Sequence, residues 1–205
     1  MSGGVFVAVD GPGGAGKSTL VRNLDQRLTA AGIPVLATTE PSHSPLGKFA
    51  RHHTGDYQGM ALACLVGADR YHHLETEVRP AVAAGRVVLC DRYTLSTVVL
   101  QAGIDDVPEQ FVRCINADAE PPDLQIVLTA PSRVLRERLA VRGSHGRFED
   151  DPTVPDREVE LYRKAAAASE RAGVPTMVAD TSQGLASIES LLSRLTSIIG
   201  GLWSQ

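Results

Sequence analysis

A glycine-rich segment near the N-terminus has the composition and spacing of a phosphate-binding loop. It runs Gly11-Pro12-Gly13-Gly14-Ala15-Gly16-Lys17-Ser18 and matches the pattern G-x-x-x-x-G-K-[ST]. Glycines let the backbone N–H groups of such a loop turn inward around phosphate oxygens, and the N-terminus of the next helix adds partial positive charge. We expect Lys17 to reach the β- and γ-phosphates of ATP. The candidate ATP-binding residues are Gly11, Pro12, Gly13, Gly14, Ala15, Gly16, Lys17, Ser18 and Thr19.

A carboxylate at the end of an apolar run could complete a magnesium site beside this loop. The run Val87–Cys90 is followed directly by Asp91, and open α/β sheets bind their ligands at the carboxyl ends of the strands. Hydroxyl and carboxylate oxygens are the ligands that Mg²⁺ prefers. We therefore expect Ser18 and Asp91 to hold Mg²⁺, directly or through water.

These candidates need regular elements to position them, and strand-like apolar runs alternate along the chain with helix-length segments. The strand-like runs are Val5–Val9, Val35–Thr38, Val87–Cys90, Leu124–Leu128 and Thr176–Ala179. The helix-length segments are residues 18–31, 58–84, 95–102, 108–117, 132–141, 156–172 and 185–199. Such alternation indicates parallel pairing, and near-continuous Val/Ile/Leu runs indicate strands buried on both faces. We expect an α/β fold with a doubly wound, parallel, five-stranded sheet.

One segment breaks this alternation. Residues 142–155 contain two glycines, two prolines and few apolar residues, and a loop of that length in a compact domain usually has a function. We expect a single domain over residues 1–205, with residues 142–155 as a lid within it. The tail after Ile199 is expected to fray, with Trp203 either at a dimer contact or loosely packed.

Composition excludes several classes of protein. The formal net charge of -4 offers no basic surface for a nucleic-acid duplex. No apolar run approaches the ~20 residues of a membrane helix. No charged segment followed by an apolar one stands at the start of the sequence, so we do not expect secretion. The cysteines, Cys64, Cys90 and Cys114, form no C-x-x-C pair. We expect all three to be small core residues in a protein of the reducing cytoplasm.

Several separated motifs resemble the thymidylate kinase family of nucleoside monophosphate kinases, in the same order and over almost the whole chain. They are Glu40-Pro41, Pro45-Leu46-Gly47, Arg51, Ala68-Asp69-Arg70, Arg79-Pro80, Ala84-Gly85, Asp91-Arg92-Tyr93, Ser96, Gln101, Pro122-Asp123-Leu124 and Arg142-Gly143-x-x-x-Arg147-Phe148-Glu149. The resemblance implies an ATP- and Mg²⁺-dependent kinase that phosphorylates a nucleoside monophosphate, dTMP by default. It also implies a homodimer.

The resemblance assigns roles to matching residues. Arg51 and Arg92 would hold the acceptor phosphate, and Arg70 would face the acceptor base. Arg142 and Arg147 would close over the transferring phosphoryl, for which planar guanidinium groups are well suited. The candidate catalytic residues are Lys17, Asp91, Arg92, Arg142 and Arg147. The candidate acceptor-binding residues are Glu40, Pro41, Arg51, Val66, Arg70, Arg92, Ser96, Leu100 and Gln101.

Three positions depart from the family pattern, all on the acceptor side. Gly13 stands where the family has an acidic residue, Val66 where it has a base-stacking aromatic, and Leu100 where it has a tyrosine beside the sugar. A kinase of the same fold with another nucleoside monophosphate or a specialised metabolite as acceptor is therefore an alternative. A non-catalytic P-loop switch protein is disfavoured, because neither Asn23 nor Asn116 begins an Asn-Lys-x-Asp element.

Overall fold

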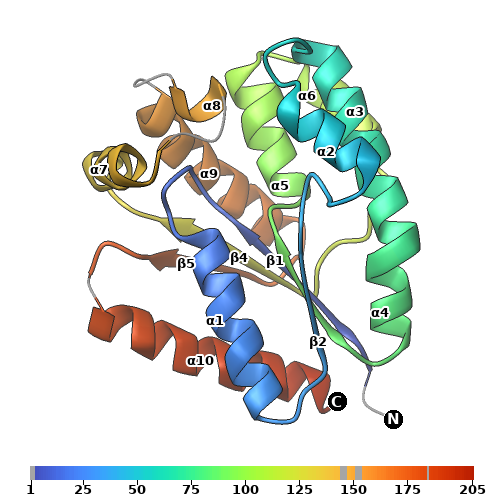
Figure 1. Ribbon diagram of the computed structural model, residues 1–205, viewed down its shortest axis with the longest axis vertical. Coiled ribbons are helices and arrows are strands. Elements are labelled where there is room, and N and C mark those ends of the chain that lie inside the picture. The colour runs from blue at the N-terminus through green and yellow to red at the C-terminus, as the bar shows by residue number, and fades with distance from the viewer. Residues whose placement is uncertain (1–2, 144–146, 151–153, 184) are drawn as a thin grey trace.

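A parallel sheet forms the centre of the protein. The computed structural model describes residues 3–143, 147–150, 154–183 and 185–205. Within these residues, five parallel strands lie in the order β2-β3-β1-β4-β5 (Figure 1). The strands are β1 (Val5–Asp10), β2 (Val35–Thr39), β3 (Val87–Asp91), β4 (Leu124–Thr129) and β5 (Thr176–Asp180). The expected α/β fold with a doubly wound parallel sheet is confirmed.

The strand order creates a gap between two loops at the carboxyl edge of the sheet. After β1 the chain runs toward β2, at one edge of the sheet. After β3 it runs in the opposite direction, toward β4. The two strands are neighbours, with Val7 opposite Leu89 and Val9 opposite Asp91. Their following loops therefore diverge at a topological switch point, which is where open α/β sheets bind ligands.

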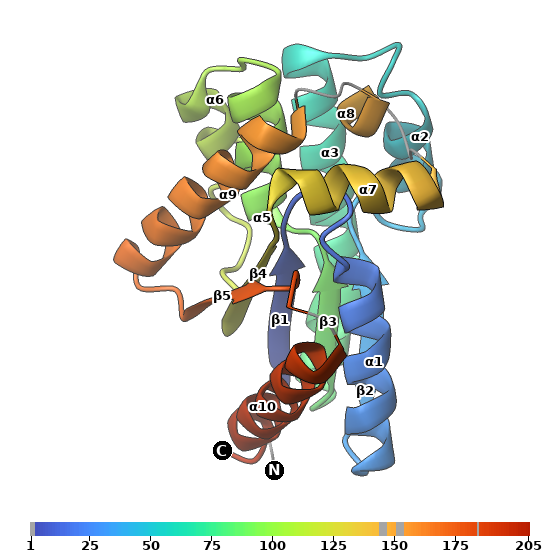
Figure 2. The same cartoon turned by 90° about the vertical axis from the view of Figure 1, so that its left-hand side faces the viewer.

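Helices cover both faces of the sheet because successive side chains of a strand point to opposite faces. Val5, Val7 and Val9 pack against α1 (Lys17–Ala30) and α10 (Leu185–Trp203), which lie side by side (Figure 2). Phe6 and Ala8 face the other way. The helices on that second side include η1 (Leu74–Val78), α4 (Arg79–Ala83) and α9 (Val154–Arg171).

Further helices lie at the carboxyl edge of the sheet (Figure 2). They are α2 (Pro45–His52), α3 (Gly59–His73), α5 (Thr94–Thr97), η2 (Val98–Ile104), α6 (Glu109–Cys114), α7 (Ser132–Arg142) and α8 (Arg147–Asp150). The segment predicted as one helix over 58–84 is a continuous run of α3, η1 and α4 with a π-helical stretch inside it. The predicted helix over 95–102 is mostly the π-helical η2. Such π-helical turns occur frequently at functional sites.

Helix α2 was not predicted, although its start carries a recognisable signal. Ser44 is its N-cap, accepting a hydrogen bond from the Gly47 N–H at 3.0 Å, and Pro45 follows at the first helical position. The buried Asp69 carboxylate accepts hydrogen bonds from the hydroxyls of Ser42 (2.6 Å) and Ser44 (3.0 Å). Helix α2 is therefore attached to α3 by polar contacts that a local pattern does not show.

The predicted lid segment is only partly described. Residues 144–146 and 151–153 lie outside the described residues, whereas Arg147–Asp150 form helix α8 and α9 begins at Val154. Part of the segment expected to be a loop is thus helical.

Two expectations about core packing are wrong. Helix α10 continues to Trp203, whose indole N–H donates to the Gly85 carbonyl at 2.7 Å, so the tail is not frayed. Cys64 and Cys114 are exposed, and of the three cysteines Cys90 alone is buried, since α3 and α6 turn the other two toward solvent. Among the helices in the described part of the chain, none is long and apolar enough to cross a bilayer.

Trp203 is expected to contribute to stability. Trp203→Ala should lower the free energy of unfolding by about 2 kcal/mol, because it removes apolar burial and one hydrogen bond. Trp203→Phe keeps most of the packing and should cost only about 1 kcal/mol. Urea denaturation measures both values, and an unchanged midpoint for Trp203→Ala would show that the contact is not stabilising.

Candidate active site

The P-loop connects β1 to α1 and adopts a backbone that requires glycine at two positions. Gly11 has a φ of 145°, and a Cβ there would lie 2.5 Å from the Leu128 carbonyl oxygen. Gly14 has a φ of 78°, and a Cβ there would lie 2.9 Å from the Leu135 carbonyl oxygen. Both distances are too short for any side chain, so the loop can pass beneath β4 and α7 only with glycines.

Two side chains, Arg138 and Thr181, donate hydrogen bonds to backbone carbonyls of the P-loop. Arg138 donates to the Gly14 carbonyl at 3.3 Å and to the Thr181 carbonyl at 2.7 Å. The Thr181 hydroxyl in turn donates to the Ala15 carbonyl at 3.1 Å. Arg138 therefore supports the loop from the far side, a role that its position on the helix leading to the lid did not reveal.

Lys17 is buried beneath the loop. Its ammonium group donates to the Pro12 carbonyl at 2.8 Å. Burial, together with the positive charge of Arg92, lowers the pKa of Lys17 to about 8. An anionic ligand at this position would relieve that electrostatic cost.

Ser18 and Asp91 lie together at the carboxyl ends of β1 and β3. The Ser18 hydroxyl donates to the Asp91 carboxylate at 2.5 Å, so one hydroxyl and one carboxylate oxygen face the same space. This donor set fits Mg²⁺, which prefers hard oxygen ligands and keeps several waters.

Arg92 lies between the P-loop and the rest of the site in a left-handed backbone conformation, with a φ of 71°. Its guanidinium donates to the Tyr162 hydroxyl at 3.2 Å and to the Ser96 hydroxyl at 3.4 Å. The pKa of Arg51 is lowered mainly by burial and, to a smaller extent, by the positive charge of Arg92. Arg92 therefore acts electrostatically on Lys17 on one side and on Arg51 on the other.

A fully buried carboxylate, Asp10, positions Arg92 and was missed by the sequence analysis. Its Oδ1 accepts from the backbone N–H groups of Tyr93 (3.1 Å) and Ser96 (3.0 Å) and from the Ser96 hydroxyl. Its Oδ2 accepts from the Gln125 amide at 2.9 Å. These hydrogen bonds fix the backbone turn that follows Arg92. Asp10 therefore positions the backbone from which the Arg92 side chain extends.

The candidate acceptor-binding residues line one cavity together with part of the candidate phosphate site. All nine of them line it. The other predicted residues that line it are Lys17, Ser18, Asp91 and Arg142. The rest of the P-loop and Arg147 are not among its lining residues. The distant segments around residues 40, 70 and 100 thus meet at one place.

Arg70 is more enclosed than the sequence suggested. Its guanidinium donates to Glu40 (2.8 Å), Thr97 (2.8 Å) and Asn116 and lies over the Tyr93 ring. Only 1% of its surface is exposed. It lines the cavity as part of a rigid wall in which its nitrogens already have partners.

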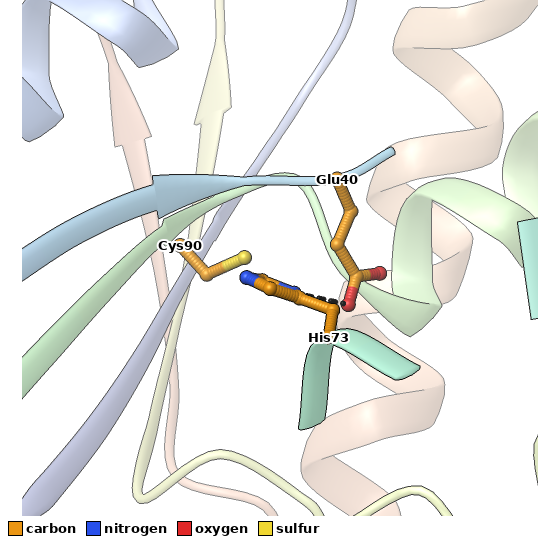
Figure 3. A group of neighbouring side chains, drawn as sticks. All are labelled: Glu40, His73 and Cys90. Carbon is orange, nitrogen blue, oxygen red and sulfur yellow. Dashed lines mark hydrogen bonds and ion pairs between the residues drawn. The ribbon is translucent and has the colours of Figure 1, made fainter. Parts of the chain in front are cut away.

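Glu40 also anchors a buried group with His73 and Cys90 (Figure 3). The other Glu40 oxygen is 3.2 Å from His73 Nδ1, and His73 Nε2 lies 2.8 Å from the Thr38 hydroxyl. The Cys90 thiol donates to the Arg92 carbonyl at 3.0 Å, and burial raises its pKa well above the usual value. Each of these groups therefore has a hydrogen-bond partner in the protein, and His73 links α3 to the carboxyl end of β2.

The two arginines of the predicted lid have different surroundings. Arg142 lines the cavity and pairs with Glu149. Arg147 pairs with Asp105 at 2.5 Å, and its Cζ lies 4.1 Å from the centroid of the Phe148 ring.

Two glutamates approach Gly13, where the family pattern has an acidic residue. Glu158 accepts from the Gly13 N–H at 3.0 Å. A Cβ on Gly13 would lie 3.0 Å from a Glu149 oxygen. Burial raises the pKa of Glu158, against the opposing charges of Arg92 and Lys17. The missing carboxylate at position 13 is therefore replaced in space by carboxylates from α8 and α9. The polar Glu158 and Tyr162, one turn apart on the buried side of α9, were the available sequence signal.

The parallel sheet, the P-loop and the cluster of cations in one cavity are those of a P-loop phosphotransferase. The sequence profile of the thymidylate kinase family matches residues 9–185. A probable thymidylate kinase of Caldivirga maquilingensis is 37% identical over 166 aligned positions, covering 79% of this chain and 80% of the relative. A thymidylate kinase of Pseudomonas fluorescens is 35% identical and covers 94% of both chains. One of Pseudomonas putida is 40% identical and covers 72% of this chain and 74% of the relative. The chain belongs to the thymidylate kinase family, and it is a kinase.

The Asp10 contacts predict a loss of both stability and activity on substitution. Asp10→Asn removes a charge that accepts four hydrogen bonds, so the free energy of unfolding should fall by about 2 kcal/mol. The turnover number should fall as well, because the turn that positions Arg92 loosens. Denaturation and steady-state kinetics measure the two effects. Asp118→Asn, an exposed carboxylate, is the control. Wild-type stability in Asp10→Asn would contradict the proposed positioning role.

Proposed function

We propose that the protein transfers the γ-phosphoryl group of ATP to the phosphate of dTMP, giving dTDP and ADP. One observation carries the proposal: a single cavity is lined both by the P-loop residues Lys17 and Ser18 and by the acceptor-side residues Arg51 and Gln101, with Arg92 acting on both. Two phosphorylated ligands can thus share one space.

The main barrier in this reaction is the approach of two anionic phosphates, so catalysis consists mostly of positioning and charge neutralisation. Lys17 is proposed to bind the β- and γ-phosphates. Arg51 and Arg92 are proposed to hold the acceptor phosphate in line with them. Mg²⁺, held by Ser18 and Asp91, would neutralise charge developing on the phosphoryl oxygens.

Arg142 is proposed to contact the transferring phosphoryl from α7, since it already lines the cavity. Arg147, proposed for the same task from sequence, would reach the phosphoryl only after leaving Asp105. We place both within one domain over residues 1–205, with residues 142–155 as its lid.

A changed acceptor is the second candidate function. Leu100 cannot offer the hydroxyl that a tyrosine would direct toward a sugar oxygen, and Gly13 lacks a carboxylate of its own. These positions favour relaxed selection among nucleoside monophosphates while the phosphate-binding arginines remain in place.

We also propose a cytoplasmic homodimer, as the family resemblance implies. Apolar side chains exposed on α2 and at the start of α3, Phe49 (38%) and Met60 (50%), support an interface on that side of the protein.

The deciding experiment measures ADP release from ATP and Mg²⁺ with a panel of nucleoside monophosphates. We expect dTMP to give the highest kcat/KM and EDTA to abolish turnover. A preference for another monophosphate would establish the second candidate. Nucleotide binding without turnover on any acceptor would establish the non-catalytic alternative.

Lys17→Ala should lower kcat by about 10²–10³-fold, because one preorganised positive group is lost from the transition state. The fold should survive, since the substitution removes a desolvated charge. Steady-state kinetics and circular dichroism measure these outcomes, with the exposed Lys48→Ala as the control. Near-wild-type turnover in Lys17→Ala would overturn the assignment of the P-loop.

The lowered pKa of Lys17 predicts pH-dependent ATP binding. With a pKa of about 8, most Lys17 side chains are neutral at a pH well above 8 in the free protein. Bound phosphates favour the protonated form, so binding at pH 9 should take up a proton, and affinity should fall as the pH rises above 8. Titration calorimetry in buffers of different ionisation enthalpy measures the uptake. Lys17→Arg, which stays protonated, should abolish it, and equal uptake in that variant would exclude Lys17 as the source.

A further inference from the structure

Helix α8 places an aromatic ring at the acceptor side of the cavity. Phe148 lines the cavity and packs against a buried apolar cluster formed by Ala50, Leu62 and Val66. These residues come from α2 and α3, about 80 to 100 positions earlier in the chain. The ring therefore reaches the acceptor pocket from a distant part of the sequence.

Among the described residues that line this cavity, Phe148 and Tyr93 are the aromatic ones. Tyr93 has no exposed surface: its ring packs edge-to-face with Phe6 and lies under the guanidinium of Arg70, and its hydroxyl donates to the Glu120 carbonyl. A ligand therefore cannot stack on Tyr93 without displacing those contacts. Phe148, in contrast, is only partly buried and lines the cavity.

We propose that Phe148 is the platform on which the base of the acceptor nucleotide stacks. The inference rests on the proposed function and deepens it by naming the residue that selects for a flat base. Val66 offers no aromatic surface to the cavity, and Phe148 packs against the apolar cluster to which this valine belongs. The aromatic surface that position 66 lacks is thus supplied by α8.

The ring is held in place before any ligand binds. The guanidinium of Arg147 lies 4.1 Å from the ring centroid and so covers one face. Arg147 is itself paired with the nearly buried Asp105. A base would stack on the opposite face, giving a guanidinium–phenyl–base sandwich. Fixing the ring in advance reduces the entropy lost when the acceptor binds.

The same contact connects recognition of the base to the phosphoryl side of the cavity. Helix α8 carries Phe148 next to Glu149, and Glu149 pairs with Arg142. A base on Phe148 would therefore stabilise the position of α8 and, through Glu149, the position of Arg142. Selection of an acceptor with a base would then affect turnover as well as binding.

The experiment compares an acceptor with a base to one without. Dissociation constants for dTMP and for deoxyribose 5-phosphate are measured by calorimetry for wild type, Phe148→Ala and Phe148→Leu. Leucine keeps apolar packing against the cluster of Ala50, Leu62 and Val66 but removes the aromatic face. We expect both variants to weaken dTMP binding by about 5- to 150-fold and to leave deoxyribose 5-phosphate binding unchanged. Phe111→Ala, a half-buried phenylalanine of α6 outside the cavity lining, is the matched control and should bind both ligands as wild type does.

A rescue tests whether the aromatic face itself matters. Val66→Phe introduced into Phe148→Ala should restore at least part of the dTMP affinity, because it returns an aromatic ring to the same wall. Equal losses for dTMP and deoxyribose 5-phosphate would overturn the inference and show a structural role for Phe148. So would unchanged dTMP affinity in both variants. The proposed function is judged separately by wild-type turnover of dTMP. If the panel selects another monophosphate, the same comparison is made with that acceptor.

Discussion

The site depends on holding several positive charges close together before any anion is present. Burial and the positive charge of Arg92 together lower the pKa values of Lys17 and Arg51. The fold tolerates this because the diverging loops after β1 and β3 also bring carboxylates to the same place. Burial disfavours the charge of Arg92, yet Tyr162 and the carboxylates of Asp91, Glu158 and Asp10 together outweigh burial and keep its pKa above the ordinary value. The cations are therefore retained without ligand and remain attractive to phosphates.

Asp10 shows how this arrangement is supported from within. A carboxylate without exposed surface would be costly unless its oxygens had partners, and here four donors supply them. The same hydrogen bonds close the turn after the left-handed Arg92. The hydrogen bonds that stabilise the buried Asp10 carboxylate are thus the same ones that orient Arg92. A substitution that removes them would affect both.

The acceptor end of the cavity is built differently. Arg70, Glu40 and His73 bond mainly to one another and to neighbouring side chains, so they form a rigid wall instead of offering free hydrogen-bonding groups. Under the proposed function, recognition of a base against such a wall would rely on shape and on a flat apolar surface. Departures from the family pattern at Gly13 and Val66 coincide with side chains that arrive from α8, Glu149 and Phe148. Small residues at positions 13 and 66 are thus approached by larger side chains from another segment.

The sequence by itself determined the features that depend on local spacing. The P-loop glycines, the apolar runs of the strands and the strand-end position of Asp91 are properties of short segments, because backbone conformation and burial have short periods along the chain. The family motifs further identified residues around positions 40, 70 and 100 that line one cavity. Only the tertiary structure decided which side chains meet across elements. It brought Asp10 to Ser96, Glu158 to Gly13, Arg147 to Asp105 and Phe148 to the cluster that contains Val66, in each case across more than forty residues. Such contacts follow from how the helices pack against the sheet, and no spacing within a single segment encodes that packing.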